Sequence, residues 1–487
     1  MKITKIKVKN YRLLKDFELD LTSVNGYEFN KSSIKNGIVN NALVYGHNGV
    51  GKSNLALAIF DIIEHLTDKQ RNENSYRNYL NAYCEKKYAS FIYEFYLNSK
   101  VVIYEYKKTD YKTIVFEKLT IDNKVVIFYD RDKNNSAQIN LKGTETLKTD
   151  IENRELSILK FVKNNSDLYI DEINDTFIAL FSFVDKMLYF RSLLDRTYIG
   201  LDVGAKHIFE DIVKKNNVED FEFFLNSAGI ECKLSIVEEV DKKTIAFNFN
   251  GKMLPFQDVA STGTYALALF YFWYQNIKDT EKVSFVFIDE YDAFYHHSLS
   301  ALIIEKLKET GVQFILTTHN TSVITNDLLR PDCYFLMNKH KISSLSKATS
   351  KELREAHNIE KMYKAENDQV ALEKINKIFL SFKYGDKYKG VLITLYLGDF
   401  EYTPSISTPY LSNFSVKDKE WNFKGVTNAS NVTSEVKEDK KLDTSEKSIL
   451  SYITKQSFQY GNKSNGSGLV SLISDSTVQE IPMTESE

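Results

Sequence analysis

The sequence predicts an α/β fold built around a parallel sheet, and two observations carry this prediction. A short apolar run at 41–45 leads into a glycine-rich turn, which is followed by apolar side chains at helical spacing. Two further apolar runs, at 283–289 and 312–317, flank a stretch with a helical pattern that stops at Gly311. Strand–helix–strand successions of this kind form units with parallel strands.

Other segments are expected to surround this core. Residues 2–21 alternate in places, which predicts an antiparallel pair of edge strands. Residues 89–129 contain four short β-rich runs, which predict a meander that decorates the core, and residues 145–240 are mostly helical in pattern. Together they suggest an insertion over about 85–245, first β and then helical. It contains no heptad run long enough for an extended coiled coil.

The helix after the glycine-rich turn is predicted from one set of apolar residues at helical spacing, namely Leu55, Ile59, Ile62, Ile63 and Leu66. We expect the core domain, with its insertion, to span 1–345, and a C-terminal extension, helical and then β, to span 346–410. Residues 411–487 are rich in Ser, Thr, Asn, Lys and Glu. Such a tail is predicted to be disordered or to fold on a partner.

Composition excludes several classes of protein. A formal net charge of -3 over 487 residues gives no overall attraction to nucleic acid or anionic lipid. The longest apolar run, at 265–274, is about half of the roughly 20 residues that a bilayer requires, and no signal peptide is recognised. The three cysteines lack the spacing of a zinc site or a disulfide framework. We therefore expect a cytoplasmic protein without a membrane segment.

The glycine-rich turn fits the pattern GxxxxGK[ST] between Gly46 and Ser53. In such a loop the backbone N–H groups converge on phosphate oxygens, and the helix N-terminus adds a favourable dipole. Lys52 should reach the β- and γ-phosphates of ATP, and Ser53 should ligate Mg²⁺. A chance glycine turn is the alternative, and the flanking strand and helix argue against it. The residues expected to surround the nucleotide here are Gly46, Asn48, Gly49, Gly51, Lys52, Ser53 and Asn54.

An acidic pair follows the second apolar run. Asp289 ends the run and Glu290 comes directly after it. A carboxylate at the carboxyl end of a strand can hold Mg²⁺, and the next acid can then polarise an attacking water. Taken alone, the pair could equally be a surface feature, and the independently found glycine loop is what favours a site.

Two further features accompany these motifs. Ser261 and Gly263 open the apolar helix at 265, which is an anion-binding geometry, although an ordinary helix N-cap is the simpler interpretation. His319 follows the third apolar run. It could be a structural histidine, but its place at a strand end favours a sensor of the γ-phosphate.

These features, in this order, resemble the ABC-type ATPases of the branch that contains SMC, RecF and OLD proteins. Gly46 to Ser53 corresponds to Walker A, and Asp289 with Glu290 to Walker B and its catalytic glutamate. Ser261 to Thr264 is similar to the signature motif, Asp292-Ala293 to the D-loop, and His319 to the switch histidine. Asn10-Tyr11-Arg12 resembles a motif on the first hairpin, in which Arg12 would approach bound nucleotide.

Within this branch the sequence resembles prokaryotic ATPases of abortive-infection and phage-defence systems. The similarity lies in STGT at 261–264, DEYDA at 289–293 and TTHNTSVI at 317–324. The signature differs from the LSGGQ of transporters. His296-His297 stands where the family usually has His-Pro, which puts the shape of that loop in question but not the acidic pair.

The resemblance implies that ATP and Mg²⁺ are sandwiched between two copies of the chain, as a homodimer or a higher homo-oligomer. It further implies a defence ATPase that controls a separate effector or toxin and responds to a phage-derived trigger. No Asp-x-Asp follows residue 345, so the metal-binding nuclease domain of OLD proteins is not expected. An SMC- or RecF-like DNA-repair ATPase is the alternative, which leaves nucleic-acid binding open, and a transporter subunit is the third possibility.

Overall fold

The computed structural model describes most of the chain in two compact units, Met1–His357 and Asn358–Glu487, and each is considered by itself. The first unit therefore continues past the boundary expected at residue 345. The described residues are 1–22, 25–69, 77–191, 198–200, 208–239, 242–279, 281–294, 296–348, 354–355, 359–360, 410–417 and 420–426.

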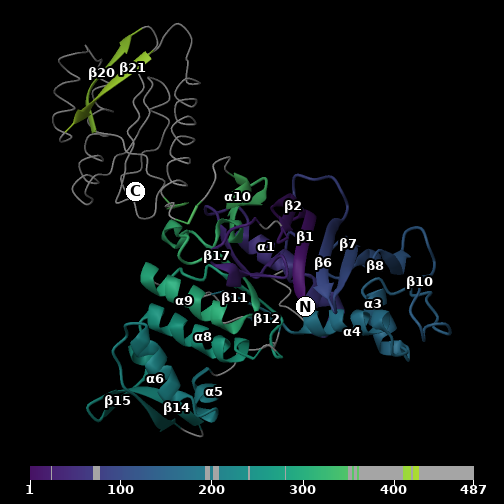
Figure 1. Cartoon of the computed structure of the whole chain (residues 1–487), viewed down its shortest axis with the longest axis horizontal. Coiled ribbons are helices and arrows are strands. Elements are labelled where there is room, and N and C mark those ends of the chain that lie inside the picture. The colour runs from purple at the N-terminus through teal and green to yellow at the C-terminus, as the bar shows by residue number, and fades with distance from the viewer. Residues whose placement is uncertain are drawn as a thin grey trace. The chain divides into compact units, whose positions relative to one another are not determined.

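The core is a seven-stranded mixed sheet in the order β12-β11-β16-β17-β5-β18-β19 (Figure 1). The five central strands are parallel, and one antiparallel strand closes each edge. Strands β5, β16 and β17 are buried along their whole length, as parallel strands between layers of helices usually are. The predicted α/β class is thus confirmed. The strands are β5 Asn41–Tyr45, β11 Met187–Arg191, β12 Tyr198–Gly200, β16 Phe285–Asp289, β17 Gln313–Thr318, β18 Tyr334–Met337 and β19 Ile342–Ser344.

A second seven-stranded sheet, entirely antiparallel, has the order β10-β9-β8-β7-β6-β1-β2. It corrects two expectations: β1 is an interior strand, since β6 pairs with its free side, and the meander continues the N-terminal hairpin. The reason is that the buried face of β6, with Phe91 and Phe95, extends that of β1, with Ile6 and Val8. The strands are β1 Lys2–Tyr11, β2 Leu14–Asp20, β6 Ala89–Leu97, β7 Lys100–Lys108, β8 Ile114–Ile121, β9 Lys124–Asp130 and β10 Gln138–Ile139.

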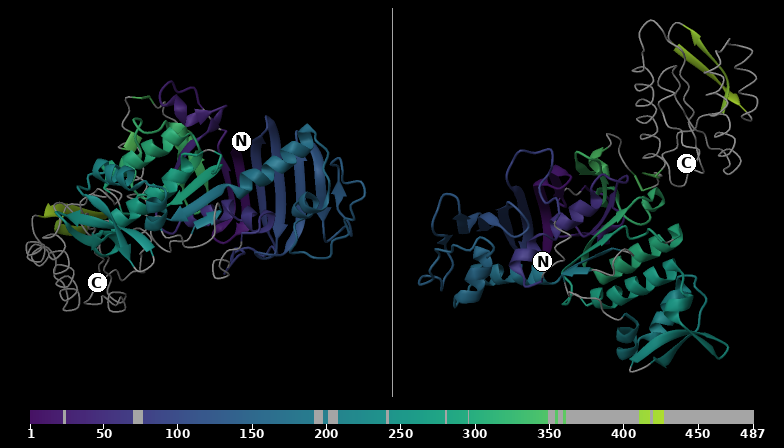
Figure 2. Two further views of the ribbon diagram at one scale, coloured as in Figure 1. Left: turned by 90° about the horizontal axis from the view of Figure 1, so that it is seen from below. Right: turned by 180° about the vertical axis from the view of Figure 1, so that it is seen from behind.

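Helices α3 (Ile158–Asn165) and α4 (Glu172–Asp185) lie across one face of this antiparallel sheet (Figures 1 and 2). The rings of Phe95 in β6 and Phe183 in α4 meet edge to face at 5.5 Å. After α4 the chain returns to the core as β11, so the expected insertion over about 85–245 is interrupted by a core strand.

The helix after the glycine-rich turn is two helices, α1 (Lys52–Ile59) and α2 (Ile62–Leu66), where the apolar spacing predicted one. The interruption falls at Asp61. Its carboxylate is buried and accepts a 2.8 Å hydrogen bond from Lys108 Nζ of β7, and the hydroxyl group of Tyr106 also donates to it. This buried ion pair, which we call the Asp61–Lys108 pair, fixes the chain between the two helices.

Between β12 and β16 the chain forms a small subdomain of helices and a three-stranded antiparallel sheet, and α9 follows the acidic pair (Figure 1). The segment predicted as mostly helical over 145–240 also contains the strands β11, β12 and β13. Helix α8 lies beside α9, and Tyr274 of α8 donates a hydrogen bond to Glu309 of α9. The elements are α5 Ile208–Lys214, α6 Val218–Ser227, β13 Leu234–Glu239, β14 Lys242–Phe249, β15 Lys252–Pro255, α7 Phe256–Val259, α8 Thr262–Ile277 and α9 His297–Thr310.

The remaining elements are short. Gly311, with a φ of 70°, ends α9 as predicted. The short elements are β3 Ile34–Lys35, β4 Ile38–Val39, α10 Leu345–Ala348 and 3₁₀ turns at Lys31–Ser33, Thr321–Val323 and Pro331–Cys333. None of the described helices combines the length and the apolarity needed to cross a bilayer.

In the second unit the described strands β20 (Tyr410–Lys417) and β21 (Glu420–Val426) form an antiparallel pair. Apart from Tyr410, they lie within the tail over 411–487 for which disorder or folding on a partner was predicted, and this expectation stays a prediction. Most of the extension expected over 346–410 and the rest of the tail lie outside the described residues.

Candidate functional site

The glycine-rich loop predicted at 46–53 joins β5 to α1. A Cβ atom at Gly46 would lie 2.7 Å from the carbonyl oxygen of Met337 and 2.9 Å from Val50 Cγ2, so only glycine fits there. Gly51 caps α1 with a φ of 106°, which favours glycine. Backbone N–H groups of the loop and of the first helical turn are therefore placed to bind an anion such as phosphate.

The other predicted loop residues are accessible to a ligand. Asn48 and Gly49 are exposed at the tip of the loop, and Ser53 and Asn54 are partly exposed in the first turn of α1. Their contacts with nucleotide remain predictions.

Lys52, the first residue of α1, is buried and points back over the loop. Its Nζ donates hydrogen bonds to the carbonyl oxygens of Gly46 at 2.5 Å and His47 at 3.3 Å, and lies 3.0 Å from the ring nitrogens of His319. Burial lowers the pKa of Lys52 to about 8, although the carboxylate of Asp289 acts in the opposite direction. The ammonium group is thus costly to bury, and a phosphate would stabilise it.

The acidic pair stands at the carboxyl end of β16, next to β17. Asp289 is fully buried, and its Oδ1 accepts a 2.6 Å hydrogen bond from the hydroxyl of Thr317. The same hydroxyl accepts a 2.7 Å hydrogen bond from the backbone N–H of Glu290, which has a φ of 51°. Thr317, one strand away, therefore fixes both acids at once.

His319 links the acidic pair to the glycine loop. Its Nε2 lies 3.8 Å from Glu290 Oε1, and burial, followed by the charge of Lys52, lowers its pKa, so the ring is neutral at pH 7. Nearby, Thr318 donates a 2.6 Å hydrogen bond to Asp292, whose pKa burial raises to about 6.

The predicted signature residues, Ser261 and Gly263, lie at the N-terminus of α8. Ser261 caps α8, where its Oγ accepts a 3.2 Å hydrogen bond from the N–H of Thr264, so the N-cap interpretation is correct. A Cβ atom at Gly263 would lie 3.0 Å from the carbonyl oxygen of Phe294, in the segment after the acidic pair. Within the described part of the chain, no hydrogen bond joins Ser261 to the glycine loop.

Arg12 lies in the turn between β1 and β2 with a φ of 48°. The next two residues pack against the glycine loop, since a Cβ atom at Gly51 would lie 3.8 Å from Leu13 Cβ and 3.4 Å from Leu14 Cδ2. The guanidinium carbon of Arg12 lies 5.6 Å from the ring centroid of Tyr11. The turn is therefore beside the loop, and contact of Arg12 with nucleotide stays a prediction.

Arg191, which the motifs did not indicate, completes this cluster. Its Nη2 lies 3.0 Å from Glu290 Oε2, and its Nε lies 3.2 Å from Asp289 Oδ2. A signal for it exists in the sequence, because the apolar run 187–190 ends in a charged residue just as 285–288 does. Without knowledge that these two runs pair, nothing distinguished it from a surface arginine.

Residues 42–325 match the family described as "AAA domain, putative AbiEii toxin, Type IV TA system". This match covers more than half of the 487 residues. The chain belongs to this AbiEii-type AAA family. The predicted resemblance to ATPases of abortive-infection systems is confirmed at that level. No curated protein matches the sequence.

Several solved structures are similar to the AbiEii-type chain in outline. The SMC head domain from Thermotoga maritima is 15% identical, with a TM-score of 0.34 over 71% of this chain and 99% of that one. An SMC head domain with an extended coiled coil, bound to the C-terminal domain of ScpA derived from Pyrococcus furiosus, is 13% identical, with a TM-score of 0.34 over 72% and 98%. The family assignment rests on the sequence match and not on these likenesses.

The AbiEii-type domain has protein groups that suit ATP with Mg²⁺. Asp289 Oδ2 is buried and makes no hydrogen bond among the described residues, although Arg191 Nε lies 3.2 Å away as an ion-pair partner. Mg²⁺ usually takes one or two protein oxygens and completes its shell with phosphate oxygens and water. Asp289 and the hydroxyl of Ser53 would hold it in that way. Accordingly, the described residues include no cluster of three or more His, Cys, Asp or Glu side chains that could hold a metal alone.

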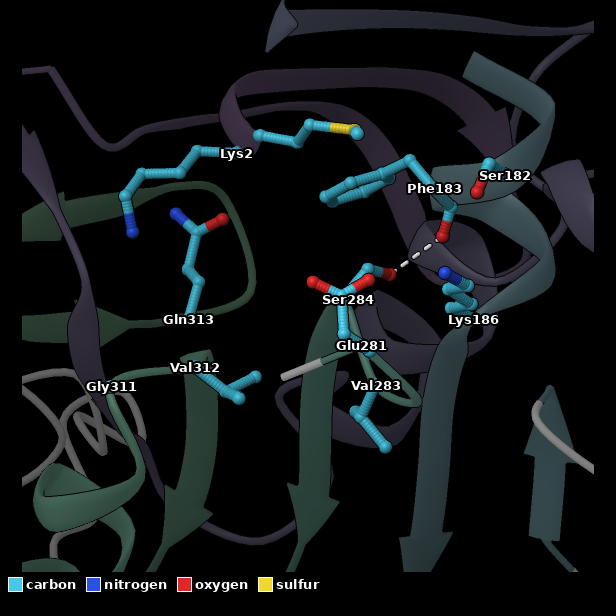
Figure 3. Close-up of a pocket in the computed structure, with 11 residues that line it drawn as sticks. Lys2, Ser182, Phe183, Lys186, Glu281, Val283, Ser284, Gly311, Val312 and Gln313 are labelled. Atoms are coloured by element: carbon cyan, nitrogen blue, oxygen red, sulfur yellow. Dashed lines mark hydrogen bonds between the residues drawn. The ribbon is translucent and has the colours of Figure 1, made fainter. Parts of the chain in front are cut away.

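A cavity of about 260 Å³ lies in the AbiEii-type domain, separate from this cluster. Its lining residues are drawn in Figure 3. Lys2, Phe183, Val283 and Gln313 are among its lining residues. It lies at the amino ends of β16 and β17, whereas Asp289 stands at the carboxyl end of β16. The candidate nucleotide site is therefore the open loop at the opposite edge of the sheet.

Proposed function

We propose that this protein is the ATP-binding and ATP-hydrolysing subunit of a prokaryotic antiphage defence system of the abortive-infection type, and that it controls a separate effector or toxin. The observation that carries the ATPase part is the convergence on His319, whose ring lies 3.0 Å from Lys52 Nζ and 3.8 Å from Glu290 Oε1. A phosphate-binding ammonium, a neutral imidazole and a carboxylate thus face one point.

Each group has a role that its chemistry suits. The glycine loop and Lys52 bind the β- and γ-phosphates, and Ser53 with Asp289 holds Mg²⁺. Glu290 polarises the attacking water, and His319 contacts the γ-phosphate. Most of the catalytic effect would come from positioning and charge, since phosphoryl transfer needs little covalent chemistry from the protein.

The site is proposed to be shared between two copies of the chain. Ser261 and Gly263 stand at the N-terminus of the 16-residue α8, and Ser261 bonds only within the first turn of that helix among the described residues. In a symmetric pair, this helix end of one copy would close over the γ-phosphate that the other copy holds.

Mixing two inactive variants tests this sharing. Lys52→Met removes phosphate binding, and Ser261→Arg blocks the helix end, so each alone should show no ATP hydrolysis. Subunits that pair at random form half of their dimers from one copy of each, and every such dimer has one intact site. The equimolar mixture should therefore recover up to about a quarter of the wild-type phosphate release.

The matched control is a mixture of Lys52→Met with Glu290→Gln. Both substitutions damage the same half of the site, so no combination of subunits restores it. Recovery in this mixture, or none in the first, would show that the site is not divided between subunits as proposed.

The antiphage role predicts protection of cells. Bacteria that carry the gene with its natural neighbours should survive phage challenge as a population, and Lys52→Met or Glu290→Gln should abolish this, measured as the number of plaques. Glu238→Gln, on an exposed part of β13, changes a glutamate in the same way and should keep protection. Unchanged protection with Lys52→Met would refute the role. Salt-sensitive binding of DNA without protection would favour the SMC- or RecF-like alternative.

A further inference from the structure

Arg191 is the last residue of β11, the strand next to β16, and the parallel register places it beside Asp289. The carboxyl ends of both strands meet at the same edge of the core sheet. The sheet therefore brings the guanidinium group of Arg191 to the acidic pair, although Arg191 and Glu290 are 99 positions apart in the sequence.

The contacts of Arg191 divide between the two acids. Its Nη2 donates a 3.0 Å hydrogen bond to Glu290 Oε2, and its Nε lies 3.2 Å from Asp289 Oδ2. The Arg191 side chain is 33% exposed, the Glu290 side chain 32%, and Asp289 is fully buried. A planar guanidinium fork can bridge two separate carboxylates, whereas a lysine ammonium is a single point of charge.

Glu290 needs such an anchor. Its backbone has a φ of 51°, a conformation that non-glycine residues rarely adopt and that surrounding contacts must hold in place. Thr317 fixes the backbone N–H, but a partly exposed glutamate side chain would still rotate freely. Arg191 Nη2 lies 3.0 Å from the Glu290 carboxylate, nearer than His319, whose Nε2 lies 3.8 Å away.

We propose that Arg191 is a positioning residue for Glu290: it holds the carboxylate in the direction from which water is activated, and the charge of the buried Asp289 keeps the guanidinium group nearby without a hydrogen bond. This inference rests on the proposed ATPase function and adds a residue to its machinery. Within the described structure, the ion pairs of Arg191 are with the acidic pair and not with the glycine loop. Its loss should therefore impair the chemical step more than ATP binding.

The experiment measures kcat and KM for ATP hydrolysis in Arg191→Ala and Arg191→Lys. Arg191→Ala should lower kcat by about 10- to 100-fold, as misplacement of a reacting group by about 1 Å does, with KM changed by less than about threefold. Arg191→Lys should recover part of the loss, because it restores the charge but not the fork. Arg154→Ala, which removes an exposed arginine paired with Asp132, should change neither constant.

A double variant separates positioning from a general effect on folding. If Arg191 acts through Glu290, then Arg191→Ala in a Glu290→Gln background should lower kcat no further. The proposal would be overturned if the two substitutions lowered kcat multiplicatively in the double variant, or if Arg191→Ala kept the wild-type kcat. A fall in kcat together with an equal rise in KM and lower thermal stability would do the same, since it would indicate structural damage.

A wild-type protein without hydrolysis would refute the proposed function, and the positioning role is then decided by stability. The equilibrium constant of urea unfolding is measured for Arg191→Ala, Glu290→Gln and the double variant. If the two side chains are in contact, the change in the unfolding equilibrium constant of the double variant should differ from the product of the two single changes by about threefold or more. Independent effects would overturn the inference.

Discussion

In Lys52→Met, ATP binding should fall by about 100-fold or more, as expected when one partner of a buried charged contact is removed. Lys52 is 5% exposed, and its ammonium group lies at the centre of the glycine loop. Isothermal titration of the purified variant with ATP and Mg²⁺ measures the loss. Lys133→Met, at an exposed lysine of the antiparallel sheet region, is the control and should bind ATP normally.

The same substitution should change how stability depends on pH. Burial lowers the pKa of Lys52 from 10.5 to about 8, so the folded protein disfavours the charged form. Below pH 8 Lys52 is protonated in both the folded and the unfolded protein, so the full free-energy cost of burying its charge is present. As pH rises from 8 towards 10.5, the folded state has lost the proton while the unfolded state still binds it, and the cost declines. Between pH 7 and 9.5 the wild type should therefore gain about 1–2 kcal/mol relative to Lys52→Met, allowing for solvent screening.

Urea unfolding of the nucleotide-free proteins at the two pH values tests this sign. Only the change in the difference between wild type and variant is compared, because the hydrogen bonds of Lys52 to the loop carbonyls contribute at both values. A difference that stays constant, or that moves against the wild type at high pH, would contradict the assigned burial cost.

Local patterns were sufficient where local chemistry decides the structure. The run at 41–45 is β5 with the predicted bounds, and the spacing of glycines in the following loop matches a real steric need at Gly46. Likewise, Gly311 ends α9 because glycine adopts its positive φ without strain. Each of these features depends on a few consecutive residues.

Patterns failed where distant segments decide. Nothing near β1 indicates that β6, more than 80 residues later, will pair with it and make it an interior strand. Arg191 joins the site only because β11 is parallel to β16, a register that periodicity does not reveal. Ser261 caps α8, as the N-cap interpretation of its pattern predicted, because a cap depends only on the residues of the first helical turn.

The break between α1 and α2 is another such case, and it leads to a prediction about stability. Lys108→Met should lower the free energy of unfolding by about 3–5 kcal/mol, because it leaves the carboxylate of Asp61 buried without its counter-charge. The side chains of Lys108 and Asp61 are 0% and 1% exposed, so water cannot replace the lost partner. Hydrogen bonds from Tyr79 at 3.1 Å and Tyr106 at 3.0 Å would remain, but they do not neutralise the charge.

Two further variants assign the loss to the unpaired charge. Lys118→Met removes a lysine of the same sheet whose partner, Glu105, is 3.2 Å away and about as exposed, at 30% against 31%, so it should cost no more than about 1 kcal/mol. Combining Lys108→Met with Asp61→Asn removes both charges and should recover much of the stability that Lys108→Met loses. Urea unfolding of the three proteins decides the matter. Equal losses in Lys108→Met and Lys118→Met would mean that the Asp61–Lys108 pair is dispensable. If the pair holds as expected, it anchors Asp61, two residues after α1, and so supports the far end of the helix that begins with Lys52.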